Sequence, residues 1–528
     1  MTRHKSLKWA RFSFALFVLI VLTAIFADPY EWIPVQVIDS FLFFQFVPSL
    51  LSFIRFLSLL AAGGFFIIVL VTFVTGRLYC SVICPLGILQ DVVNRIARWK
   101  SQKKRFFKFK KAQTALRITF LSIMAVATIA GAGWIVTWLD PHSLAGRFFT
   151  YILKPAVILA NNLAAAVLTK IDVYSLHHQN SPIPSLAPVL ITLVVSGGIG
   201  YFSWKRGRLF CNTICPVGTF LGVVSKYALF KVRFNRELCT RCGKCSANCK
   251  SECIDLKNFT IDHSRCVVCF NCLVSCPDDA LSFSRTVRGA QSVVNEEIDK
   301  INTTSRRHFL VAALTMLTGN RLMALNNQKA PASTKKLIRN VKDHPVAPPG
   351  SVSIARFNEI CTGCSLCVSA CPTHVLQPAL AEYGLAGFMQ PRMDYKTSFC
   401  NFDCTRCGEV CPTSAILPLT REQKHVTQMG RVVFVKENCV VYTDETDCGA
   451  CSEHCPTKAV KMVPYKNGLL IPEVNPDICI GCGACEYPCP LVTPYKAIYV
   501  NGHAVQQIAE KPQDEEKVEI KMEEDFPF

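Results

Sequence analysis

The sequence predicts an α-helical membrane domain, built from two repeated two-span units, followed by small cysteine-rich α+β domains. Three observations lead to this fold class. Hydrophobic residues concentrate before about residue 205, in uncharged runs close to the length that crosses a bilayer. One twelve-residue element occurs twice within that part. Most of the 29 cysteines follow a single short spacing.

Four apolar runs are predicted to cross the membrane: residues 12–27, 56–75, 118–139 and 185–204. The first run is slightly short, but Arg11 can extend its charge to the bilayer surface. A fifth run, residues 148–169, contains Lys154, Pro155, Asn161 and Asn162. We expect this run to be an outer interfacial or re-entrant segment, which leaves four spans.

The repeated element reads GRLYCSVICPLG at residues 76–87 and GRLFCNTICPVG at residues 207–218. Each copy also has an Asp-Pro pair upstream, Asp28-Pro29 and Asp140-Pro141. If both cysteine pairs face one compartment, an even number of crossings must separate them. Two crossings satisfy this condition, so the repeat unit is a span, an Asp-Pro loop, a second span and the cysteine pair.

The net charge of +19 raises the question of a nucleic-acid partner. Residues 95–111 carry nine basic side chains and no acidic one, next to a predicted span. The positive-inside rule expects this pattern in a cytoplasmic loop. The charge is therefore read as a membrane-topology signal, and no nucleic acid is expected as a partner.

The cysteine spacing C-x2-C-x2-C-x3-C, or a close variant, occurs six times and is typical of 4Fe–4S clusters. Three thiolates on one tight loop reach three irons, and the fourth thiolate binds the cluster of a partner motif. Disulfides would show irregular spacing, and zinc ribbons a longer gap between pairs. Cys253 is left over and is assigned a structural role. The predicted ligands are Cys239, Cys242, Cys245 and Cys249; Cys266, Cys269, Cys272 and Cys276; Cys361, Cys364, Cys367 and Cys371; Cys400, Cys404, Cys407 and Cys411; Cys439, Cys448, Cys451 and Cys455; and Cys479, Cys482, Cys485 and Cys489.

Six 4Fe–4S clusters follow from these motifs. Two motifs in residues 232–284 form a two-cluster domain, in which Cys276 joins the first triplet and Cys249 the second. The other four motifs lie in residues 351–503. For these, the first motif is expected to pair with the fourth and the second with the third.

The paired thiols of the repeat, Cys80 and Cys84, and Cys211 and Cys215, stand at i and i+4 on one helical face. Two interpretations stay open for them. They meet across the repeat axis and hold a further metal or cluster, or they pack together or form a reversible disulfide. Haem is not expected, because C-x-x-C-H is absent and the histidines lie outside the predicted spans.

A segment with Ser305, Arg306 and Arg307 ahead of a short apolar run has the form of a twin-arginine export signal. The alternative is a basic linker with both cysteine-rich domains in the cytoplasm. The predicted domains are a four-span membrane domain at residues 1–225, a two-cluster domain at 226–290, the signal and tether at 291–350, a four-cluster domain at 351–505 and a charged tail at 506–528.

Residues 1–290 resemble the NapH-type membrane ferredoxins, with their spans, Cys-x3-Cys-Pro pairs and two-cluster domain. Residues 303–505 resemble the NapG-type (MauM/NapG) ferredoxins through PPGS at 348–351, CTGCSLCVSACP at 361–372, CTRCGEVCPTSAI at 404–416 and CIGCGACEYPCP at 479–490. The whole chain thus looks like a fusion of the two. Lys250, which stands where proline usually follows the fourth ligand, departs from the pattern.

The resemblance implies a quinol dehydrogenase component of a bacterial inner membrane, with the first ferredoxin domain cytoplasmic and the second periplasmic. Electrons would pass from a membrane quinol through 4Fe–4S clusters to a periplasmic reductase or cytochrome. A bond-making catalyst is not indicated. A second hypothesis is a factor for metal reduction, cofactor maturation or redox sensing, since ferredoxins of the CcoG and NosR kind share the repeated element. Asp28, Asp140 and His142 are candidate proton acceptors for quinol, although capping a turn is the more ordinary role for the aspartates.

Overall fold

The computed structural model describes residues 2–28, 30, 32–56, 59–100, 107–179, 185–285 and 337–511. The predicted twin-arginine segment around Arg306 and Arg307 lies outside the described residues, as does the tail from residue 512.

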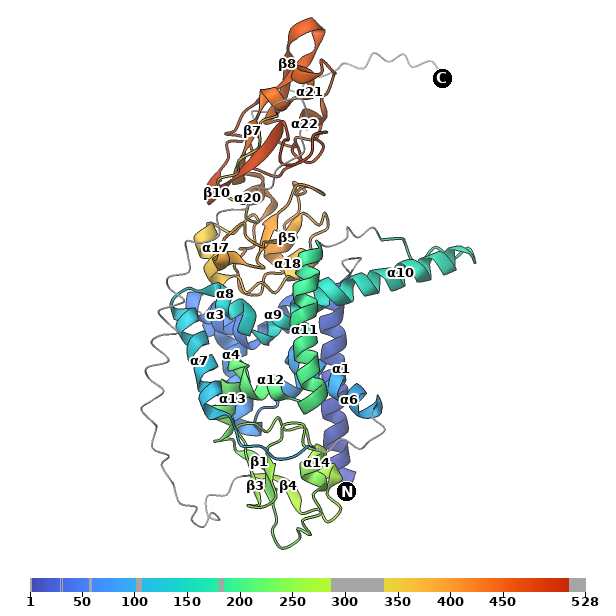
Figure 1. Cartoon of the computed structure of the whole chain (residues 1–528), viewed down its shortest axis with the longest axis vertical. Helices are drawn as coiled ribbons and strands as arrows, with labels where there is room; N and C mark the ends of the chain where they lie inside the picture. The colour runs from blue at the N-terminus through green and yellow to red at the C-terminus, as the bar shows by residue number, and fades with distance from the viewer. Residues whose placement is uncertain are drawn as a thin grey trace. The chain divides into compact units, whose positions relative to one another are not determined.

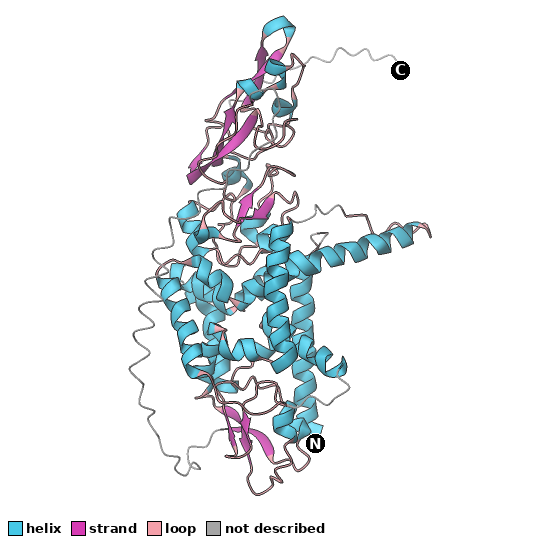
Figure 2. Ribbon diagram, in the orientation of Figure 1, coloured by secondary structure: helices cyan, strands magenta, loops and turns pink. Residues whose placement is uncertain are grey.

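The part of the chain before the first cysteine-rich module is helical (Figures 1 and 2). Its helices are α1 (Thr2–Ala27), α2 (Val35–Phe43), α3 (Phe46–Phe56), α4 (Leu59–Thr75), α5 (Tyr79–Val82), α6 (Pro85–Lys100), α7 (Thr114–Ile129), α8 (Gly133–Leu139), α9 (Pro141–Phe148), a π-helical turn (Phe149–Leu153), α10 (Lys154–Thr169), α11 (Leu186–Arg206), α12 (Leu209–Thr213) and α13 (Pro216–Ser225).

By length and composition, three of the described helices can cross a membrane: His4–Ala27, Pro141–Thr169 and Leu186–Arg206. The bent pair Val35–Phe43 and Phe46–Ile54 would make a fourth. The first and last of the three coincide with predicted spans. The predicted span at residues 56–75 corresponds to α4, whose apolar stretch Gly63–Thr75 is shorter.

The predicted span at residues 118–139 is not one continuous helix. Helix α7 ends at Ile129 and α8 begins at Gly133. Gly131 takes a left-handed backbone conformation, with φ 71°, and the Ala132 N–H donates to the Ala127 carbonyl at 2.8 Å. A glycine in this conformation ends a helix cheaply because it lacks a Cβ. The sequence stays apolar across the break, so hydropathy alone did not predict that the helix ends there.

The doubtful run at residues 148–169 is helical throughout, and α10 points away from α1 and α11 in Figure 1. Leu159, Leu163 and Val167 form an exposed apolar stripe along it. Lys154 is buried and its Nζ donates to the carbonyl of Ser369 at 2.5 Å. The placement of α10 along the membrane surface stays a prediction.

The two copies of the repeated element have the same local structure. In each copy a long helix, α4 or α11, ends at a glycine with positive φ, 84° at Gly76 and 65° at Gly207. An arginine follows, then a short helix that carries the first cysteine. Pro85 and Pro216 begin α6 and α13 directly after the second cysteine, at a helix position that needs no N–H donor.

The module after α13, here called the first module, contains β1 (Phe230–Phe234), α14 (Lys244–Ala247), β2 (Ile254–Asp255), β3 (Thr260–Ile261), α15 (Asn271–Ser275) and β4 (Leu281–Arg285). Antiparallel pairing of β1 with β4 joins its ends, with Phe230 opposite Arg285 and Phe234 opposite Leu281. The short pair β2–β3 lies between the two cysteine motifs in sequence. The core of the first module contains apolar side chains together with cysteines of both motifs.

The C-terminal module contains α17 (Ile354–Ile360), α18 (Leu366–Ser369), β5 (Leu376–Pro378), β6 (Pro391–Met393), α19 (Arg406–Glu409), α20 (Arg421–His425), β7 (Thr427–Phe434), α21 (Val440–Thr443), α22 (Ala450–Glu453), β8 (Val460–Pro464), β9 (Leu470–Val474) and β10 (Ile498–Ile508), with 3₁₀ turns at Leu385–Gly387, Lys436–Asn438 and Lys466–Gly468. Its strands pair antiparallel as β5–β6, β7–β10 and β8–β9.

Two boundaries of the C-terminal module differ from those predicted. Strand β10 continues to Ile508, where it pairs with Thr427, beyond the predicted end at residue 505. At the other end, the predicted tether already packs on the module. The Asn340 N–H donates to the Pro494 carbonyl at 2.7 Å, and Lys342 pairs with Glu486 at 2.8 Å.

Candidate redox centres

The two motifs of the first module exchange their fourth cysteines as predicted. One cavity is lined by Cys239, Cys242, Cys245 and Cys276, and a second by Cys249, Cys266, Cys269 and Cys272. Left-handed residues shape the ligand loops, among them Gly243 and Phe270, which directly precede α14 and α15. Each cavity therefore offers four thiols, the donor set that a 4Fe–4S cluster takes.

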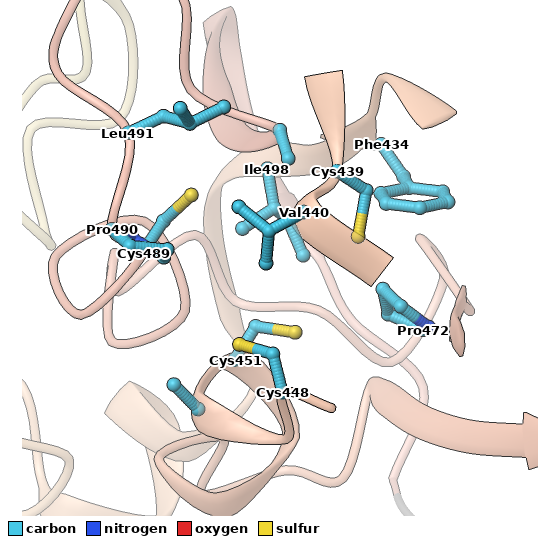
Figure 3. Close-up of a pocket in the computed structure, with 12 residues that line it drawn as sticks. Phe434, Cys439, Val440, Cys448, Cys451, Pro472, Cys489, Pro490, Leu491 and Ile498 are labelled. Atoms are coloured by element: carbon cyan, nitrogen blue, oxygen red, sulfur yellow. The ribbon is translucent and has the colours of Figure 1, made fainter. Parts of the chain in front are cut away.

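The pairing expected for the C-terminal module is wrong. Cys439, Cys448 and Cys451 line a cavity with Cys489, so the third motif pairs with the fourth (Figure 3). Cys455 in turn interacts electrostatically with Cys479, Cys482 and Cys485.

The first motif likewise pairs with the second. Cys411 interacts with Cys361 and Cys367, and Cys371 with Cys400 and Cys407. The strands explain this arrangement, because β7 and β10 enclose motifs three and four while β5 and β6 accompany motifs one and two.

Cys253 is buried, as a structural role requires, but it also borders a ligand set. Its Sγ lies 3.5 Å from the Sγ of Cys249, and it lines the same cavity as Cys266. The hydrogen bond with Cys253 lowers the pKa of Cys249 to about 7, against the opposing effect of burial. The extra cysteine thus favours the thiolate form of a predicted ligand.

The four thiols of the repeat come together in the helical bundle. Cys80, Cys84, Cys211 and Cys215 are all buried in one apolar cluster. Cys84 lies near enough to Cys80 and Cys211 for their charges to interact, and Cys215 interacts with the other three. We call these four cysteines the thiol core. The thiols thus meet across the repeat axis, and both interpretations, a further metal or cluster and packed or reversibly oxidised thiols, stay predictions.

Two arginines cross between the repeats and support the thiol core. Arg77 of the first copy donates through Nη2 to the Cys211 carbonyl at 3.3 Å, and Arg208 of the second copy donates through Nη1 to the Cys80 carbonyl. Arg77 Nη2 also approaches Cys80 Sγ at 3.8 Å. Cys215 is the N-cap of α13, where the Gly218 N–H donates to its sulfur at 3.4 Å. Cations and helix N-termini stabilise thiolates and anionic groups.

Lys250, the departure from the usual Cys-Pro pattern, anchors the first module on α6. Its ammonium pairs with Asp91, which also accepts from Arg208 Nε at 2.8 Å and Nη2 at 2.7 Å. Burial lowers the pKa of Lys250 to about 8, and the charge of Asp91 opposes this effect. Arg11 adds a third cation, 3.5 Å from the carboxylate.

The three candidate proton acceptors have different surroundings. Asp28 accepts from the N–H groups of Tyr30 and Ile33 at 3.1 and 2.9 Å, in a turn. Asp140 is the N-cap of α9 and accepts from the N–H groups of His142 and Ser143 at 3.1 and 2.9 Å. The capping role considered for the aspartates is confirmed at Asp140. His142 is buried, and neither ring nitrogen has a hydrogen-bond partner among the described residues.

Sequence reasoning missed Arg77, Arg208 and Asp91. The two arginines stand at the same place in both copies of the repeated element, which was the available signal for them. Nothing in the sequence around Asp91 indicates that its partners come from residues 208 and 250.

None of the described cysteines forms a disulfide. Within the described ranges, no three histidine, cysteine, aspartate or glutamate side chains gather in a way that could hold a single metal ion.

Two family models match the chain. One, described as a 4Fe-4S binding domain, matches residues 57–104 and 186–237, which contain the two thiol pairs of the repeat. The other, described as a 4Fe-4S dicluster domain, matches residues 360–415 and 446–492. The first of these two ranges contains motifs one and two, in agreement with their pairing in the structure.

The chain is similar to several curated proteins over part of its length. The putative electron transport protein YccM of Escherichia coli is 26% identical over 41% of this chain and 53% of its own length. The ferredoxin-type protein NapH of Escherichia coli is 25% identical over 44% of this chain and 70% of its own length. The methylamine utilization ferredoxin-type protein MauM of Methylophilus methylotrophus is 36% identical over 25% of this chain and 61% of its own length.

No solved structure matches the chain. The chain is a ferredoxin-type protein with 4Fe–4S binding domains and is related to NapH. Its apolar helices and this relationship suggest a membrane protein.

Proposed function

We propose that the chain is a membrane-bound electron-transfer protein, which takes electrons from quinol and passes them to a periplasmic reductase or cytochrome. The six motifs hold six 4Fe–4S clusters and the thiol core holds a seventh. When bound, such clusters accept and release one electron at a time. The position of the thiol core between the two ferredoxin modules is the observation that carries this proposal.

On the first-module side, Arg77 connects the thiol core to the ligands of the module. Arg77 Nη1 donates to the Ser264 carbonyl at 2.9 Å, two residues before Cys266, while Nη2 faces Cys80. The charge of Arg77 also acts on Cys266. One buried side chain therefore touches the thiol core and the ligand loop of the Cys249, Cys266, Cys269 and Cys272 set.

On the other side, Tyr79 and Asp140 connect the thiol core to the C-terminal module. The buried Tyr79 lies within electrostatic range of Cys84 and Asp140, and Asp140 lies within that range of Cys364. The backbones approach closely here, since a Cβ built on Gly146 would lie 2.4 Å from the Cys364 carbonyl oxygen. Thiol sets thus continue from the bundle into the first motif of the C-terminal module.

Within the C-terminal module the four thiol sets follow one another. Cys367 interacts with Cys407, which links the sets of motifs one and two. The Cys400 N–H donates to the Cys482 carbonyl at 2.9 Å, which links motif two to motif four. The set of Cys439, Cys448, Cys451 and Cys489 comes last, and its partly exposed Cys448 makes it the candidate exit to a partner.

Contacts at the two ends of α1 support modules on opposite sides of the membrane. Near the start of α1, Lys8 interacts with Cys269 of the first module. Near its end, the Phe26 carbonyl accepts a hydrogen bond from Ser369 Oγ of the C-terminal module. From Lys8 to Phe26 the helix rises about 27 Å at 1.5 Å per residue. This is close to the roughly 30 Å of bilayer hydrocarbon.

The curated relatives support electron transfer as the general function, but not the identity of the donor or the acceptor. The names of YccM, NapH and MauM describe electron transport or ferredoxin-type proteins. Quinol as donor and a periplasmic acceptor come from the resemblance to NapH-type and NapG-type ferredoxins. Export of the second module would use the twin-arginine segment around Arg306.

Iron and acid-labile sulfide counts on anaerobically purified full-length protein test the proposal, together with reduction by menaquinol. Seven clusters give about 28 irons and as many sulfides per chain. Menaquinol is expected to reduce them. Protein that carries zinc without sulfide, or whose intact clusters menaquinol does not reduce, would contradict the proposal.

A further inference from the structure

A large cavity lies where α1, α6 and the first module meet. Its volume is about 740 Å³, and most of its lining comes from α1 between Lys5 and Leu19 and from α6 between Ile88 and Arg98. Cavities of this size hold cofactors and other small ligands.

One wall of the cavity is the ligand loop of a predicted cluster. Asn271, which lines the cavity, stands between Cys269 and Cys272 in the chain, and Lys250 directly follows Cys249. All three cysteines belong to the same thiol set. A molecule in the cavity would therefore lie one residue away from the ligands of a redox centre.

The polar part of the cavity offers hydrogen-bond donors. Six cationic side chains and a single carboxylate, that of Asp91, line the cavity. Asp91 already pairs with Arg208 and Lys250. Arg11 Nε and Arg98 Nε and Nη2 are buried without a hydrogen-bond partner among the described residues. Buried donors usually have partners, so these atoms indicate a ligand with oxygen acceptors.

The opposite part of the cavity is apolar and open to the outside. Trp9, Leu16 and Ile96 line it and remain 61%, 44% and 47% exposed. Helix α1 is long and apolar enough to cross the membrane, so this opening faces lipid at the bilayer surface. A ligand with a polar head and an apolar tail fits both parts.

We propose that this cavity binds the headgroup of the quinol and is the entry point for electrons, an inference that rests on the proposed function. The quinol loses two electrons and two protons there and leaves as the quinone, as two O–H bonds break and two C=O bonds form. The electrons pass singly to the cluster held by Cys249, Cys266, Cys269 and Cys272, and the protons go to water at the polar end. The surrounding cations stabilise negative charge on the quinol oxygen as its proton leaves.

An anionic phospholipid would satisfy the cations and the apolar opening equally well. It would give no reason for the cavity to border a redox centre, whereas an electron donor requires that position. The candidates Asp28 and Asp140 have their carboxylates engaged in turns and caps instead.

The test uses the full-length protein in nanodiscs and blocks the opening with the double variant Leu16→Trp, Val92→Trp, since both residues line the cavity. Ile20→Trp is the matched control, because Ile20 is an exposed residue of the same helix that does not line the cavity. Cluster reduction by menadiol is expected to slow by about tenfold or more in the double variant and by less than about twofold in the control. Iron content and reduction by dithionite should be unchanged in both.

Photolabelling with an azido derivative of a short-chain quinone gives a second measurement independent of electron transfer. Labels are expected on the peptides that contain Trp9 and Ile96, and the double variant should lose them. Labels near Asp140 and His142 instead, or displacement of the probe from Trp9 by cardiolipin without any effect on menadiol oxidation, would overturn the inference. If menadiol does not reduce even the wild-type clusters, the proposed function itself fails.

Discussion

At the scale of single residues, Asp91 gathers three cationic side chains around one carboxylate. Its carboxylate pairs with Arg208, Lys250 and Arg11, and the side chains of Arg208 and Lys250 are only 1% and 7% exposed. Burial would raise the pKa of Asp91, but these cations hold it well below its usual range. The carboxylate therefore stays ionised and joins α6, α12 and the first module.

Replacement of Asp91 by asparagine leaves buried cations without a counter-charge. Asp91→Asn is expected to lower the free energy of unfolding by about 3 kcal/mol. Asp403→Asn is the control, because Asp403 pairs with His425 at 63% exposure, and its cost should stay below about 1 kcal/mol. Denaturant unfolding in detergent measures both variants. Equal stability of Asp91→Asn and the wild type would contradict the role given to Asp91.

The sequence located the residues whose spacing is local and missed those whose partners are distant. The two ligand triplets of the first module and the exchange of Cys249 and Cys276 followed from spacing alone. The partner of Lys250 is 159 positions away in the chain, so no window of sequence contains both residues.

At the scale of elements, close packing within each copy of the repeated element depends on the glycine that follows its Cys-Pro pair. A Cβ on Gly87 would lie 2.2 Å from the Cys80 carbonyl oxygen, and one on Gly218 would lie 2.3 Å from that of Cys211. Real Cβ atoms do not approach backbone oxygens this closely. The two helices α6 and α13 can therefore begin beside the thiol core only because these positions lack side chains.

Gly218→Ala is expected to destabilise the protein by about 2 kcal/mol or more, because backbone must move to make room. Gly200→Ala is the matched control in helix α11, where no heavy atom lies within 4 Å of the added Cβ. There alanine should be neutral or stabilise by up to about 1 kcal/mol, since it favours the helix. Thermal unfolding followed by circular dichroism compares the two, and equal effects would contradict this account of the packing.

The sequence was least informative about where helices end and which strands pair. The break between α7 and α8 sits inside an unbroken apolar run, and hydropathy does not detect a glycine in a left-handed conformation. Partner exchange in the C-terminal module depends on which strands pair. The pairing of β7 with β10 joins segments more than sixty residues apart, so spacing could not determine it.

At the scale of the whole molecule, the two ferredoxin modules are expected to face different compartments. An epitope tag inserted after Gly468, in the turn before β9, should be accessible to antibody in intact spheroplasts. A tag inserted after Lys257, in the turn between β2 and β3, should be accessible only after lysis. Both turns are exposed, so insertion should leave the cores intact. Accessibility of both tags only after lysis would place both modules in the cytoplasm and remove the need for an export signal.

We expect the thiol core to link the two modules as a redox centre. Spin counting by low-temperature electron paramagnetic resonance, after addition of menaquinol to the full-length protein and to the Cys80→Ser, Cys211→Ser variant, tests it most directly. Dithionite reduction and the iron content of the remaining motifs serve as controls. We expect menaquinol to reduce the clusters of both modules in the wild type and only those of the first module in the variant. Reduction of the C-terminal clusters at the same rate in both proteins would contradict the claim.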